Sequence, residues 1–158
     1  MITRESLIKD TTEYVTRALW TYKQIDDINS ELYVNEEKRA ETIFNNLLQI
    51  CQIRSATCDY KGPTNNFMSS SFLELFYDVC SLVNAIYWYE CFYHFTYADL
   101  YDNASTVVEN AFDIADDRFL VGTDLTHVPE AIAAQEYINK LMEDLKAKYG
   151  EQSTSLEN

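Results

Sequence analysis

The stretch YWYECFYHFTYADLY, residues 87–101, sets the expected architecture of this chain. It holds eight Phe, Trp or Tyr residues together with His94, and four tyrosines recur at every fourth position: Tyr89, Tyr93, Tyr97 and Tyr101. Positions four apart are neighbours on one face of an α-helix. Apolar residues at helical spacing continue upstream to about residue 71 and cover most of the helix circumference. The pattern predicts a central aromatic-rich helix surrounded by other helices.

This predicted helix is long for a globular protein. Residues 71–101 make about thirty positions, whereas helices of roughly eleven or twelve residues are typical. We therefore predict a bend or a break near His94–Tyr97. Most of the rings are expected in the core, where each buried tyrosine hydroxyl needs a hydrogen-bond partner. Because a small bundle cannot readily hide so many rings from one helix, some of the four tyrosines are expected at the surface or in a homodimer interface.

Two helices are predicted before the aromatic segment. The first spans about residues 3–28, with Thr3 as its N-cap and apolar residues at 3.6-residue spacing. The second begins after Asn35, a good capping residue, and continues to about residue 54. The Gly62-Pro63 pair and the polar residues around it then indicate a loop.

Two more helices are predicted after the aromatic segment. One spans about residues 105–119. The last begins at Pro129, a residue favoured at the first helical position, and ends at Gly150 as its C-cap. Thr126 or His127 is expected to cap its N-terminus.

These elements define the predicted fold. With only three glycines and two prolines in 158 residues, the composition favours helices over sheets. We predict an all-α, single-domain bundle of about five helices around the central aromatic-rich helix, in residues 1–150. Residues 151–158 are expected to form a flexible C-terminal tail.

The net charge of −14 is the strongest global feature. A chain this acidic repels nucleic acids and anionic membrane surfaces, so its charged partners are expected to be basic: a nucleic-acid-binding protein, a polycation or a divalent metal ion. The longest run without a charged residue near the apolar centre, residues 79–89, is too short to span a bilayer. No signal peptide is recognisable, and the four scattered cysteines are interpreted as reduced. We therefore expect a cytoplasmic protein, in the host cytoplasm if it is viral.

The acidic residues are unevenly distributed. Residues 62–117 carry nine acidic and no basic residues. On the predicted helix 105–119, acids recur at the spacing of one exposed face, where neighbours lie about 5–6 Å apart. The alternative interpretation is a solvated face that only keeps the protein soluble. As partner-binding residues the pattern predicts Asp99, Asp102, Glu109, Asp113, Asp116 and Asp117, with Tyr93, Tyr97 and Tyr101 beside them.

Catalytic and metal-binding patterns are weak. The sequence has no nucleotide-binding glycine loop and no nucleophile elbow. Cys91 and His94 lack zinc-finger spacing, and Glu90 and His94 are four apart rather than the three that a di-iron bundle requires. Asp124 and His127 have no recognisable nucleophile near them. We expect no catalytic residues, no cofactor and no bound metal.

Charge and size together suggest a function. They are reminiscent of the acidic DNA-mimic inhibitors that phages and mobile elements use against host nucleases, an analogy without any shared motif. The leading hypothesis is a non-enzymatic inhibitor that occupies the basic nucleic-acid groove of a host defence nuclease, in the manner of anti-restriction or anti-CRISPR proteins. The alternatives are an immunity protein that neutralises a basic toxin, and a structural or regulatory protein that self-associates through its tyrosines. An enzyme with its site around Glu90, Cys91 and His94 is a further alternative.

Overall fold

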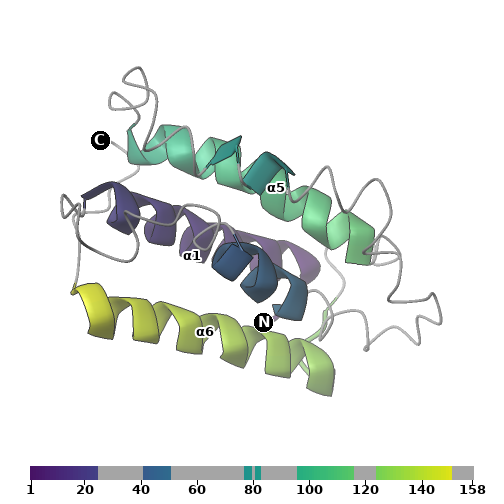
Figure 1. Cartoon of the computed structure of the whole chain (residues 1–158). Helices are drawn as coiled ribbons and strands as arrows, with labels where there is room; N and C mark the ends of the chain where they lie inside the picture. The colour runs from purple at the N-terminus through teal and green to yellow at the C-terminus, as the bar shows by residue number, and fades with distance from the viewer. Residues whose placement is uncertain (25–40, 51–76, 80, 83–95, 116–123, 151–158) are drawn as a thin grey trace.

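The computed structural model describes residues 1–24, 41–50, 77–79, 81–82, 96–115 and 124–150 (Figure 1). Three long helices dominate this part of the chain: α1 (Arg4–Gln24), α5 (Tyr97–Ala115) and α6 (Pro129–Tyr149). Residues 41–50, 77–79 and 81–82 are also helical. Within the described residues, β-type pairing is limited to an isolated antiparallel bridge between Thr3 and Asp124. The predicted all-α fold is confirmed.

Helix α1 is at the centre of the described residues. It lies between α5 and α6 and contacts both of them, and helix 41–50 lies in front of it (Figure 1). The sequence predicted that an aromatic-rich helix holds the central position. Most of that helix, residues 71–76, 80 and 83–95, is outside the described residues, as is the predicted tail, 151–158.

A reciprocal capping box starts α1. The Ser6 N–H donates to Thr3 Oγ1 at 3.0 Å, and the Thr3 N–H donates to Ser6 Oγ at 2.8 Å. These two bonds satisfy backbone donors that the helix itself leaves unpaired, so the predicted Thr3 N-cap is confirmed. The predicted apolar face of α1 is confirmed where the structure describes it, because its members are buried: Leu7, Tyr14, Val15, Ala18 and Leu19.

A row of threonines in α1 is buried together with that apolar face, and the apolar spacing in the sequence does not predict their burial. Thr11, Thr12 and Thr16 have no more than 1% of their surface exposed. Each hydroxyl donates to the backbone carbonyl four residues earlier, at 2.6–2.7 Å. A buried hydroxyl that is hydrogen-bonded within its own helix avoids most of the cost of desolvation. The polar residues on this face are therefore compatible with close packing.

The observed start of α5 differs from the start predicted for the helix at residues 105–119. It begins at Tyr97, not near residue 105, so Tyr97 and Tyr101 belong to α5 rather than to the aromatic helix. The physical reason is a second capping box. The Thr96 N–H donates to Asp99 Oδ2 at 2.9 Å, and the Asp99 N–H donates to Thr96 Oγ1 at 3.1 Å. This helix start agrees with the predicted break near residues 94–97.

Helix α6 confirms two of its three predicted end signals. Pro129 occupies the first turn, and Gly150 is the C-cap at φ 75°, with its N–H bonded to the Lys146 carbonyl at 2.7 Å. The predicted cap by Thr126 or His127 is wrong. Val128 is the N-cap and makes no side-chain capping bond.

Thr126 instead attaches the N-terminal residues to the turn before α6. Its hydroxyl donates to Asp124 Oδ1 and accepts from the Ile2 N–H at 3.0 Å. The Leu125 N–H donates to the Ile2 carbonyl at 2.6 Å. These bonds link residues that are more than 120 positions apart, and they hold the start of α1 beside the start of α6.

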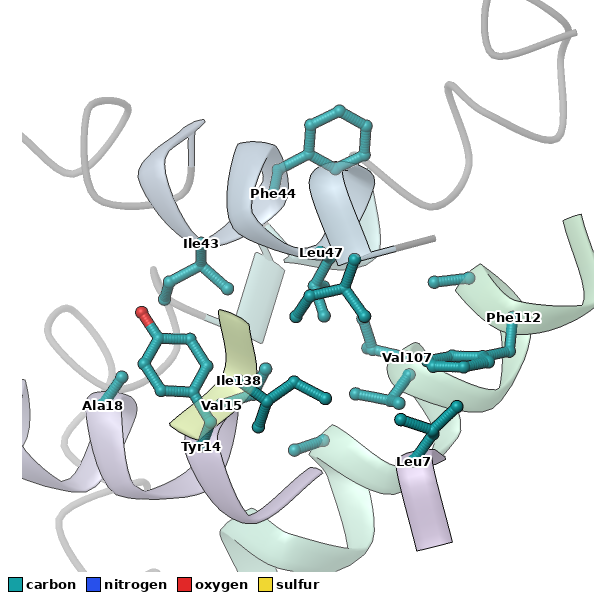
Figure 2. Packing of buried hydrophobic residues seen from close by; sticks show 14 of the residues in the cluster. Leu7, Tyr14, Val15, Ala18, Ile43, Phe44, Leu47, Val107, Phe112 and Ile138 are labelled. Carbon is teal, nitrogen blue, oxygen red and sulfur yellow. The ribbon is translucent and has the colours of Figure 1, made fainter. Parts of the chain in front are cut away.

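The core joins α1, α5, α6 and helix 41–50 (Figure 2). Among the described residues, its largest fully buried side chain is Phe112 of α5. A polar triad lies at its edge, where Asn46 Nδ2 donates to the Tyr14 hydroxyl at 3.0 Å and the Tyr137 hydroxyl donates to Asn46 Oδ1 at 3.3 Å. One asparagine from helix 41–50 thus connects α1 to α6.

Candidate partner-binding surface on α5

Helix α5 has a strict division between a buried and an exposed face. The buried side follows three- and four-residue steps: Tyr97, Leu100, Ala104, Val107, Val108, Ala111 and Phe112. Asp99, Asp102 and Glu109 are exposed on the opposite face. At a rise of 1.5 Å per residue, these carboxylates extend over about 15 Å of the helix axis. Asp113 follows Glu109 by one turn of α5, but its side chain lies outside the described residues.

The acidic residues of α5 are not balanced by basic residues on the same helix. The helix contains four acidic residues and neither Lys nor Arg. By contrast, α1 has four basic and three acidic residues, and α6 has three basic and four acidic residues. Acids that lack basic neighbours on their own helix are not neutralised by the usual pairs at positions i and i+4. Among the three long helices, α5 is therefore the one with a strong negative charge along its length.

Asp99 has a structural role in addition to its charge. Its carboxylate accepts the Thr96 N–H, and its backbone carbonyl accepts a bond from Asn103 Nδ2 at 2.8 Å. An acidic side chain in the first turn also interacts favourably with the helix dipole. The sequence contains a signal for this role that was not used in the prediction, the Thr-x-x-Asp pattern at residues 96–99.

The two described tyrosines of the predicted site differ in exposure. Tyr97 is only 5% exposed and packs edge-on against Trp20 of α1, with ring centroids 5.9 Å apart and an interplanar angle of 83°. Burial raises the pKa of Tyr97, and a hydrogen bond from Arg17 opposes this shift. The Tyr97 ring is thus part of the core, whereas Tyr101 is partly exposed.

Tyr101 lines a groove between α1 and α5. The groove has a volume of about 480 Å³, and its lining from α5 follows four-residue steps: Tyr101, Ser105 and Glu109. Its lining from α1 is formed by the first three turns of that helix: Arg4, Glu5, Ile8, Lys9 and Thr12. Two basic residues, Arg4 and Lys9, and two acidic residues, Glu5 and Glu109, therefore line the same groove.

The described residues include only part of the predicted site. Tyr93, Asp116 and Asp117 lie outside the described residues, as do Cys91 and His94. The part of the chain that the structure describes has no group of three or more His, Cys, Asp or Glu side chains positioned to hold a metal ion. In that same part, no helix is both long enough and apolar enough to cross a membrane.

Asp124 and His127 are exposed in the turn before α6. The hydroxyl and the backbone N–H of Thr126 bind the Asp124 carboxylate and lower its pKa, and the charge of His127 adds a smaller effect in the same direction. The carboxylate thus organises the turn through these bonds.

No protein-family model matches the chain, and comparisons with curated proteins and with solved structures gave no significant match. Inference about function therefore depends on the geometry and the charge of this chain alone.

Proposed function

We propose that this protein is a small, non-enzymatic inhibitor that binds a basic, nucleic-acid-binding protein through the exposed face of α5. The observation that carries the proposal is the placement of Asp99, Asp102 and Glu109 on one face of a single helix that contains no basic residue. A rigid helix holds these charges in place before binding, so little conformational entropy is lost when a partner binds. In its most specific form, the protein mimics DNA and occupies the nucleic-acid groove of a host defence nuclease in the cytoplasm.

The charge spacing supports a partner that normally binds phosphates. Asp102 and Glu109 are seven residues apart, or about 10 Å along the axis, and Asp99 precedes Asp102 by about 4.5 Å. Phosphates of one DNA strand recur on a similar scale, with an axial rise of about 3.4 Å per nucleotide. A basic groove that accommodates a row of phosphates can therefore contact several of these carboxylates at once.

Capture at low salt from a bacterial lysate tests the proposal. The immobilised protein is expected to retain nucleic-acid-binding proteins and to release them as salt rises or when short duplex DNA is added, because both compete for the same cations. The informative variant is Asp102→Lys/Glu109→Lys, which changes two exposed acids of α5. Asp99 stays unchanged because its carboxylate also caps the helix. We expect the variant to bind at least about tenfold more weakly.

The matched control is Glu136→Lys/Glu143→Lys. Both residues are exposed on α6, so the control changes the net charge by the same amount on a different helix. Circular dichroism establishes that both variants remain folded. The proposal is wrong if the two variants lose binding equally, since overall charge alone then explains capture. It is also wrong if duplex DNA fails to release the captured proteins.

A further inference from the structure

The start of α6 is joined to the start of α1 by a group of hydrogen bonds that we call the α1–α6 clasp. The Ile2 carbonyl accepts the Leu125 N–H, and the Ile2 N–H donates to the Thr126 hydroxyl. Thr3 and Asp124 form the antiparallel bridge beside these bonds. The Leu125 side chain is only 1% exposed, so the clasp is anchored in the core.

The first half of α6, residues 129–136, has weak anchoring of its own. Its N-cap, Val128, makes no side-chain capping bond to the first backbone N–H groups of the helix. Among the described residues, the first two turns bury only Ala131 and Ala134, whereas the second half buries Ile138 and Leu145. Because alanine removes less apolar surface from water than isoleucine or leucine, packing stabilises the first half less than the second.

The first half of α6 runs beside the first turns of α1 in the same direction. The clasp joins the two helix starts, and farther along Gln135 Nε2 donates to Asp10 Oδ2 at 2.9 Å. The next connection follows at Tyr137, which reaches Tyr14 of α1 through Asn46. The first half is thus held at both of its ends, and release of the clasp leaves it attached at one end only.

We propose that the α1–α6 clasp is a strap that closes the first half of α6 onto α1, and that this half opens as a separate unit when the clasp is released. A segment held by few apolar contacts opens at a lower free energy than the whole fold. The second half of α6 stays in place during this opening, because Ile138 and Leu145 belong to the core. The opening involves no residue of α5, so it is independent of the proposed function.

The Thr126 hydroxyl is the group to change, because it accepts the Ile2 N–H and donates to Asp124. Thr126→Val keeps the shape of the side chain and removes the hydroxyl, whereas the matched control Thr126→Ser keeps the hydroxyl. Amide hydrogen exchange of the full chain, followed by NMR, measures the opening of each helix. In Thr126→Val we expect the amides of residues 132–136 to exchange about two- to tenfold faster, the range for the net loss of a hydrogen bond.

The amides of α5 and of residues 142–149 are expected to exchange at their original rates, and Thr126→Ser is expected to resemble the unmodified protein. The proposal is overturned if residues 132–136 show no acceleration in Thr126→Val. It is also overturned if all helices accelerate by the same factor, since the hydroxyl then contributes only to global stability. Equal acceleration in Thr126→Ser and Thr126→Val contradicts it as well.

A second measurement needs no variant and so remains decisive even if Thr126→Val does not fold. Exchange of the unmodified protein is followed at increasing, sub-denaturing urea. Because urea sensitivity grows with the surface exposed on opening, residues 132–136 should show a weak dependence on urea and the core amides of α5 a strong one. The same strong dependence for both sets of amides means that the first half of α6 opens only with the whole fold, and the strap is then refuted.

Discussion

The capping box at Thr96 and Asp99 gives the sharpest test of how α5 is built. Thr96→Ala removes the oxygen that accepts the Asp99 N–H at 3.1 Å. Loss of a threonine N-cap costs about 0.5–2 kcal/mol. Thr96 is half-buried and its capping bonds are exposed, so water can partly replace the lost acceptor. We therefore expect a loss near the lower half of that range, about 1 kcal/mol.

The second half of the box predicts a graded series at Asp99. Asp99→Asn keeps a side-chain oxygen that can accept the Thr96 N–H but removes the charge beside the helix N-terminus, which is typically worth about 0.3–1 kcal/mol. Asp99→Ala removes both contributions and is expected to cost more than the asparagine variant. The order of stability should thus be wild type, then Asn, then Ala.

Urea denaturation followed by circular dichroism measures these differences. In a chain of this length, 1 kcal/mol also corresponds to a shift of about 2–4 °C in Tm. Thr106→Ala is the matched control, because Thr106 is exposed in the interior of the same helix and its hydroxyl makes only a long bond of 3.4 Å to the Asp102 carbonyl. Since alanine is the better helix former, this control should be neutral or slightly stabilising. Equal losses for Thr96→Ala and Thr106→Ala would refute the assignment of Thr96 as the cap.

Three further predictions concern the core. Asn46→Ala breaks both hydrogen bonds of the polar triad and leaves the buried Tyr14 hydroxyl without its donor. The free energy of unfolding should therefore fall by about 1–3 kcal/mol in urea titrations. A loss within experimental error would contradict the triad. Phe112→Ala empties the largest fully buried position among the described residues and should lower the free energy of unfolding by about 3–5 kcal/mol. Phe112→Leu should lower it by less than half as much, as measured by calorimetry. Burial raises the pKa of Tyr14 above its ordinary value of 10.0, and Tyr137, Asp144 and Tyr149 add to the shift while Asn46 opposes it. The neutral phenol therefore stabilises the fold below pH 10, and this contribution is lost as pH rises above that value. Tyr14→Phe should show a smaller loss of stability at alkaline pH than the unmodified protein. Identical pH profiles for the two proteins would contradict a role of Tyr14 in that loss.

The local signals in the sequence were reliable where one or two residues determine the backbone. Thr3, Pro129 and Gly150 mark helix ends in the structure as their chemistry predicts. The apolar spacing in α1 also identified its buried face, because a 3.6-residue period is a property of the helix itself. The start of α5 was misplaced by eight residues, although its capping pattern is present in the sequence. Tyr97 and Tyr101 continue the four-residue spacing of Tyr89 and Tyr93, so the sequence pattern placed them in the aromatic helix instead.

Properties that depend on how helices meet did not follow from the sequence. All four threonines of α1 look polar in the sequence, and only the packing of α1 between α5 and α6 shows that they are buried. The sequence also did not decide which of Tyr97 and Tyr101 is exposed. Two tyrosines at helical spacing look alike until a neighbour such as Trp20 covers one of them.

The sequence alone determined the helical class, several helix ends and the excess of acid in the middle of the chain, because these follow from local backbone chemistry and composition. Only the tertiary structure decided that Asp99, Asp102 and Glu109 share the exposed face of one helix, and that Glu109 lines a groove together with residues of α1. The physical reason is that burial and electrostatic surroundings are properties of contacts between distant segments, and such contacts exist only once the chain has packed.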